Sequence, residues 1–78
     1  MNPEKIDISG EELKKLRSIK GIKQEVIAKH LHISQQAYSK LERCQIISGS
    51  RLDDLLKALD YSSEDIIKMK DFLSTLSS

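Results

Sequence analysis

Apolar residues recur at intervals of three and four positions in five separate stretches of the chain, the spacing expected of helices that bury one face. The five stretches cover about residues 10–20, 24–31, 35–43, 50–59 and 63–76. No stretch shows the strict alternation of apolar and polar residues that is typical of strands. We therefore expect an all-α fold, in which residues 9–78 form one compact five-helix domain behind a flexible lead-in of residues 1–8.

Serines mark the expected helix starts. Ser9 is followed three residues later by Glu12, the pattern of a capping box, and Ser62 is followed in the same way by Asp65. Ser34 is the expected N-cap of the third helix, and Ser50 with Asp53 is the expected cap of the fourth. The residues expected on the inward faces, in chain order, are Leu13, Leu16, Ile19, Ile27, Ala28, Leu31, Ala37, Tyr38, Leu41, Leu52, Leu55, Leu56, Leu59, Ile66, Met69, Leu73 and Leu76.

Length and composition suit one small, soluble domain. The chain has 78 residues, of which 38% are hydrophobic and 32% charged. Since no apolar run approaches the ~20 residues that cross a bilayer, and the first residues lack the apolar core of a signal peptide, we expect no membrane association. Cys44 is the single cysteine and has no partner in the chain for a disulfide, which favours a reducing, cytoplasmic location.

Charge is unevenly distributed along the chain. The net charge is only +1, but residues 13–43 carry eight basic and two acidic residues, whereas the segments before and after are acidic overall. A basic unit of this kind fits phosphate binding, and it also fits ordinary solvated helix faces.

The second and third helices are both short, and the connection between them is tight. The small Ala28 lets two such helices cross closely, so the third helix can project its N-terminal residues into a DNA major groove. Gln35 and Gln36 lie at that leading end, and a glutamine amide can pair with adenine through two hydrogen bonds. Ser39 and Lys40 lie one turn further along and can reach the same groove.

The segment LRSIKGIKQEVIAKHLHISQQAYSKLER resembles the helix-turn-helix core of the lambda-repressor-like family, also called Xre or Cro/CI. The resemblance extends from about residue 13 to residue 59. It implies a sequence-specific regulator that binds double-stranded DNA. The implied base-contacting residues are Gln35, Gln36, Ser39 and Lys40. Gln24 matches the phosphate-binding glutamine of the family, and the further candidates for phosphate contact are Lys23, Ser34 and Arg43. Arg17 and Glu42 match a semi-buried salt bridge that ties the first helix to the third.

Three positions depart from the family pattern. His32 replaces the glycine of the turn and is expected either to adopt a left-handed conformation or to avoid it at some strain. Cys44 and Asp60 stand where glycines commonly follow the third and fourth helices. Because of these departures, the resemblance does not predict the conformation of the loops. None of the implied DNA-contacting residues is changed.

Other chemistries find little support in the sequence. His30, His32 and Cys44 are possible metal ligands, but the histidines are two residues apart and no fourth ligand is evident. Cys44, next to Arg43, is a possible redox switch, although a lone thiol is more often a small hydrophobic residue. There is no nucleophile–base pair or phosphate-binding loop, so we expect neither an enzyme nor a cofactor.

The last expected helix extends past the minimal core of the family. Its apolar residues either close the core or form a two-fold contact with a second copy, and the candidate dimer residues are Ile66, Met69, Phe72, Leu73 and Leu76. The sequence thus favours a small dimeric repressor. The alternative is an antitoxin, in which the acidic C-terminal half binds a basic toxin.

Overall fold

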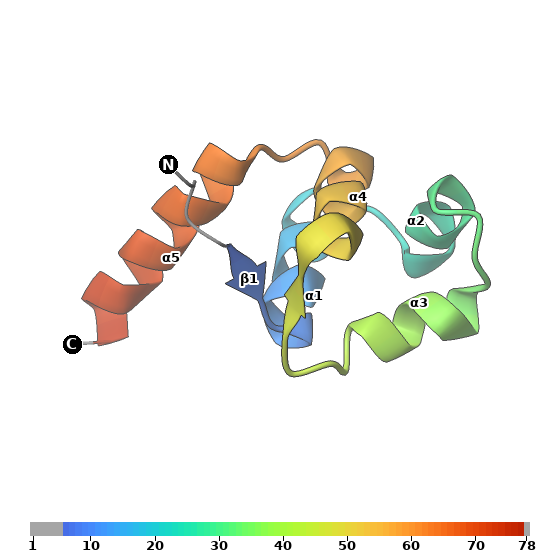
Figure 1. Cartoon of the computed structure of the whole chain (residues 1–78), viewed down its shortest axis with the longest axis horizontal. Coiled ribbons are helices and arrows are strands. Elements are labelled where there is room, and N and C mark those ends of the chain that lie inside the picture. The colour runs from blue at the N-terminus through green and yellow to red at the C-terminus, as the bar shows by residue number, and fades with distance from the viewer. Residues whose placement is uncertain (1–5, 78) are drawn as a thin grey trace.

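The computed structural model describes residues 6–77, and their side chains from residue 6 to residue 72. The order of elements is β1 (Asp7–Ile8), α1 (Gly10–Ile19), α2 (Gln24–His30), α3 (Gln35–Leu41), β2 (Ile47–Ser48), α4 (Gly49–Leu59) and α5 (Ser63–Ser77). The five expected helices are all present, and α2 and α3 end one to two residues earlier than expected. Figure 1 shows α2 and α3 together at one end of the molecule and α5 at the other.

Side-chain caps start three of the helices as the sequence predicted. The Ser9 hydroxyl accepts a hydrogen bond from the Glu12 amide at 3.0 Å, and the Glu12 carboxylate accepts one from the Ser9 amide at 2.9 Å. Ser62 and Asp65 make the same reciprocal pair at the start of α5. These bonds satisfy backbone donors that the first turn of a helix leaves unpaired.

The expected cap of α4 was wrong. The helix begins at Gly49 rather than after Ser50, and its N-cap is Ser48, whose side chain makes no capping hydrogen bond. Ser48 is also the last residue of β2, so the chain passes directly from strand to helix. Gly49, with a φ of +67°, makes that abrupt change of direction.

A two-stranded antiparallel sheet was missed by the sequence analysis, which placed residues 7 and 8 in a lead-in. Asp7 pairs with Ser48 and Ile8 with Ile47. Both isoleucines are buried, and Ile8 is only 1% exposed. Two-residue strands are too short to show an alternating pattern, and their pairing joins segments about forty residues apart. Residues 1–5 lie outside the described part of the chain.

The core gathers apolar side chains from β1, β2 and all five helices. Its buried members are Ile8, Leu13, Leu16, Ile27, Ala28, Tyr38, Ile47, Leu52, Leu55, Leu56, Leu59 and Ile66. Among the expected inward residues whose side chains the structure describes, two face solvent instead. Ile19 is 74% exposed, because α1 ends there and the chain turns away, and Ala37 is exposed because α3 packs through Tyr38 and its neighbours one turn later.

Tyr61, in the loop between α4 and α5, links this loop to α1. Its hydroxyl donates a 2.9 Å hydrogen bond to the Leu16 carbonyl, which lies near the open end of α1. The Lys20 ammonium lies 4.6 Å from the centre of the Tyr61 ring, within the range of a cation–π contact. The start of α5 is thus fixed against the body, and Ile66 follows it into the core.

Among the residues that the structure describes, two non-glycine residues adopt the left-handed conformation, and they stand at two of the three positions where the sequence departs from the family's glycines. His32, in the turn between α2 and α3, has a φ of 59°, and Asp60, after α4, has a φ of 63°. A β-carbon is crowded in this region, and the cost is roughly 1–2 kcal/mol per residue.

Replacing His32 with glycine is therefore expected to stabilise the protein. Removing the β-carbon relieves the crowding, while the greater freedom of glycine in the unfolded chain offsets part of the gain, which leaves about 0.5–1 kcal/mol. His32 is exposed, so little packing is lost. Thermal unfolding followed by circular dichroism should show a Tm higher by a few degrees. A lower Tm would mean that the imidazole makes a stabilising contact that outweighs the backbone strain.

Candidate nucleic-acid interface

The first turn of α3 is held at the surface by a cap on one side and core packing on the other. The Ser34 hydroxyl accepts a 3.0 Å hydrogen bond from the Ala37 amide. Tyr38 is 0% exposed, and Leu41 is partly buried against the same core. Three of the four candidate base-contacting residues, Gln35, Gln36 and Lys40, are exposed, whereas Ser39 is half-buried. The helix therefore presents its two adjacent amides and one ammonium to solvent from a fixed backbone.

A chain of polar contacts connects the interior to this turn. The Arg17 guanidinium donates two hydrogen bonds to the Glu42 carboxylate and a third to the Ile22 carbonyl at 2.8 Å. The side chains of Arg17 and Glu42 are only 13% and 5% exposed, so the expected ion pair is present and largely buried. It ties α1 to Glu42, the C-cap residue that directly follows α3.

Gln24, at the start of α2, extends the chain of contacts outward. Its amide nitrogen donates to the Glu42 carboxylate at 2.9 Å, and its amide oxygen lies 3.5 Å from the amide nitrogen of Gln35. The second of these distances is at the outer limit of a hydrogen bond. Gln24 is thus held in place by Glu42 and in turn lies against the first residue of α3.

The environment of Glu42 favours its charged form. Burial is the largest single influence and by itself would raise the pKa of this carboxyl, but the hydrogen bonds that it accepts and the nearby charge of Arg17 together outweigh burial, so the pKa lies below its usual value. Glu42 is therefore ionised at neutral pH and keeps its acceptor oxygens for Arg17 and Gln24.

The candidate phosphate-contacting residues surround α2 and α3. Lys23 precedes α2 and Arg43 follows α3, and both side chains are exposed. Ser34 is exposed, although its hydroxyl already caps α3. Gln24 is half-buried with its amide in use, so it differs from the free side chain that a simple phosphate contact would need.

Gly10 is a residue that the sequence analysis missed and on which the placement of α3 depends. Its amide donates to the Cys44 carbonyl at 2.8 Å. A β-carbon built at Gly10 would lie 2.5 Å from the carbonyl carbon and oxygen of Glu42 and 2.6 Å from the Leu41 oxygen. The start of α1 thus lies directly against the end of α3, an approach that only glycine permits. A glycine at the start of an amphipathic helix was the only available signal.

The candidate dimer residues on α5 do not share one exposed face. Ile66 is 0% exposed within the chain's own core, so it was wrongly assigned to a dimer contact. Met69 packs partly against the same core, while Phe72 is 62% exposed. Leu73 and Leu76 lie outside the part of the chain whose side chains are described. Lys70, which lies within 3.7 Å of the carboxylates of Asp7 and Glu12, holds this helix near β1 and α1.

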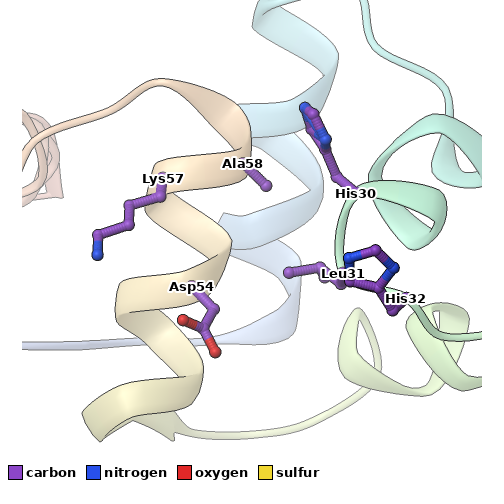
Figure 2. Close-up of a pocket in the computed structure, with 6 residues that line it drawn as sticks. All are labelled: His30, Leu31, His32, Asp54, Lys57 and Ala58. Carbon is purple, nitrogen blue, oxygen red and sulfur yellow. The ribbon is translucent and has the colours of Figure 1, made fainter.

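A groove of about 430 Å³ separates the end of α2 from α4, and His30, Leu31, His32, Asp54, Lys57 and Ala58 line it. Figure 2 shows the two imidazoles at different places along the groove, with Lys57 extending away from them. Among the residues that the structure describes, no three histidine, cysteine, aspartate or glutamate side chains are grouped to hold a metal ion.

Comparison with protein-family models identifies a family that this chain matches. A family model described as helix-turn-helix matches residues 13–66, well over half of the chain, and the match includes α2, α3 and α4. No curated protein and no solved structure matches. Over the described residues, none of the helices has the length and hydropathy to cross a membrane. With α2 and α3 joined by a tight turn, and with that model covering both, the chain belongs to the helix-turn-helix family of DNA-binding regulatory proteins, of the lambda-repressor-like (Xre, or Cro/CI) type.

Proposed function

We propose that the protein is a sequence-specific regulator that binds double-stranded DNA by inserting the first turn of α3 into the major groove. The observation that carries the proposal is the exposure of Gln35, Gln36 and Lys40 on a helix whose opposite side is anchored by the fully buried Tyr38. Members of this family place the N-terminal residues of the second of the two helices against base edges.

The two glutamines suit adenine. A glutamine amide donates to N7 and accepts from the N6 amino group of adenine, and each such bidentate pair discriminates by roughly 1–3 kcal/mol. Gln24 can also fix the orientation of the Gln35 amide. The Gln35 amide nitrogen carries two hydrogens, so it can donate one to the Gln24 oxygen and keep the other for a base. Such a contact would orient Gln35 before DNA arrives, so Gln24 would position a base contact besides lying near the phosphates.

The phosphate contacts are assigned first to Lys23 and Arg43. Ser34 and Gln24, whose side chains already make hydrogen bonds within the protein, are secondary candidates, and Lys40 is another if it does not reach a base. The exposed cations at the two ends of the helix pair would lie against the DNA backbones on either side of the groove. They would supply affinity and register without sequence preference, and binding would weaken with added salt.

A dimer would give such a regulator its specificity, because one small head contacts few base pairs. The chain measures 36 × 29 × 21 Å, so two copies side by side can place their α3 helices about one turn of DNA, ~34 Å, apart. Phe72 and Ile67 are the exposed large apolar side chains described on α5 and would contribute to the contact. We propose repression of the bound promoter as the outcome of this binding.

An antitoxin role is the second candidate. The observation that favours it is the acidic surface of the C-terminal half, where Asp53, Asp54, Glu64 and Asp65 are all exposed. A basic toxin would fit this surface while α3 remained free for DNA. A toxin-like reading frame beside the gene would support this role, and an inverted repeat in the gene's own promoter would support autorepression.

The change Gln36→Ala tests the base-contacting role. Binding to the preferred site should weaken by about 10-fold or more while binding to unrelated duplexes stays nearly unchanged, because the lost hydrogen bonds discriminate by roughly 1–3 kcal/mol. Preference should relax at one base pair only. The measurement is a titration against the preferred site and each single-base variant of it.

The change Lys23→Ala is the matched comparison. It should weaken binding to every sequence alike and reduce the slope of affinity against salt by about one, as expected of a lost phosphate contact. If Gln36→Ala behaved in the same uniform way as Lys23→Ala, Gln36 would not recognise bases.

A further inference from the structure

Ala37 is an apolar residue on an otherwise polar surface. It lies in the first turn of α3, where its amide is fixed by the hydrogen bond to Ser34 at 3.0 Å, and its side chain is exposed. The other exposed residues of this seven-residue helix, Gln35, Gln36 and Lys40, are all polar. Its methyl group is thus presented to solvent from the same turn as the two glutamines.

The methyl group of Ala37 does not take part in packing α3 against the core. Tyr38 and Leu41 supply the packing against the core, and the sequence pattern had placed Ala37 with them. Lys40 lies three residues after Ala37, the spacing at which side chains are neighbours on a helix surface, and Gln36 directly precedes Ala37 in the same turn. Any DNA that meets these two side chains must pass close to Ala37.

We infer that Ala37 is a specificity-determining residue that contacts the C5-methyl group of a thymine. This inference rests on the proposed entry of α3 into the major groove. A methyl group can neither donate nor accept a hydrogen bond, and the thymine methyl is the apolar group that base edges expose in that groove. The thymine would lie in the base pair that Gln36 contacts or in an adjacent one, and the preferred site would contain adenine and thymine at neighbouring positions.

The test removes the thymine methyl without altering any hydrogen bond. The preferred duplex is first selected with the wild-type protein, and each thymine of a half-site is then replaced in turn by deoxyuridine. At one thymine the dissociation constant should rise about fourfold, the factor that corresponds to burying one methyl group away from water. Replacements at thymines outside the contacted base pairs should leave it unchanged.

Comparison with variants assigns that effect to Ala37. In Ala37→Gly the thymine and deoxyuridine duplexes should bind equally, while in Lys40→Ala the fourfold difference should persist. Any loss of folded protein in a variant weakens binding to both duplexes by the same factor, so it cancels in their ratio. The deoxyuridine series with wild-type protein needs no variant and provides a test of its own.

The outcomes distinguish the role of Ala37 from the proposed sequence-specific binding of DNA. A preferred site that tolerates deoxyuridine everywhere would overturn the role of Ala37 and leave sequence-specific binding intact. A methyl effect that persists in Ala37→Gly, or that disappears in Lys40→Ala alone, would overturn it as well. If selection yielded no preferred site, both the proposed function and this inference would be wrong.

Discussion

The change Gly10→Ala is expected to lower the free energy of unfolding by about 2–4 kcal/mol, the cost of overpacking together with that of one weakened hydrogen bond. The added β-carbon would lie 2.5 Å from the carbonyl group of Glu42, and backbone atoms at that distance cannot move aside as a flexible side chain would. The helix start would have to withdraw, and overpacking in a well-packed region costs about 1–3 kcal/mol. Withdrawal would also lengthen the 2.8 Å hydrogen bond from Gly10 to Cys44.

The matched control is Gly21→Ala. Gly21 has a φ of +69°, but a β-carbon there would meet no atom within 4 Å, so this change tests backbone strain without collision. The expected loss is about 1 kcal/mol, because the lower freedom of alanine in the unfolded chain offsets part of the strain. Urea unfolding of both variants measures the difference. Equal losses, or a Gly10→Ala variant as stable as wild type, would show that α1 and α3 are not in such close contact.

Breaking the buried ion pair should have an effect of similar size. Arg17→Ala leaves the Glu42 carboxylate, which is 5% exposed, without its main partner, and stranding a buried charge costs about 3–5 kcal/mol. A domain of this length has a total stability of only roughly 4–12 kcal/mol. Lys70→Ala, which removes exposed pairs with Asp7 and Glu12, is the control and should cost less than about 1 kcal/mol.

The Arg17–Glu42 pair should also make the protein less stable as the pH falls. The pKa of Glu42 is lower in the folded protein than in the unfolded chain, so the ionised carboxylate stabilises the fold above the unfolded pKa of about 4.3. That contribution should diminish as the pH falls from about 5 through the folded pKa. In Glu42→Gln this part of the acid sensitivity should be absent. Urea unfolding between pH 7 and pH 3 measures it, and parallel curves for the two proteins would contradict the assignment.

Replacing Glu42 should also disturb the candidate interface. Glu42 accepts the hydrogen bond that holds Gln24, and Gln24 lies against Gln35, so losing Glu42 removes the support of a proposed base contact. Stability and recognition are thus connected through one carboxylate.

Much of this architecture was predictable from local patterns. Five helices follow from apolar spacing and from serine caps, and two of the caps involve reciprocal bonds between residues only three apart. The Arg17–Glu42 pair was also foreseen, but only through resemblance to a family, since nothing local connects residues 25 positions apart.

The remaining features depend on contacts that no local pattern encodes. The pairing of β1 with β2 and the approach of Gly10 to Glu42 both join distant segments. Ile19 and Ala37 fit a helical period, yet the orientation of each helix at its ends decides whether such residues are covered. Ile66 fits a dimer stripe as well as a core stripe, and the packing of α5 resolves that choice in favour of the core.

A competition titration against bulk DNA tests the central claim most directly. Protein bound to a labelled duplex, itself selected from a random pool, is challenged with genomic carrier DNA and with the unlabelled duplex at one stated salt concentration. If the tip of α3 recognises bases, the selected duplex should compete at least about 10³-fold better than an equal mass of carrier. Equal competition by the two would mean that the protein binds only the DNA backbone, and the assignment of Gln35 and Gln36 to base recognition would be wrong.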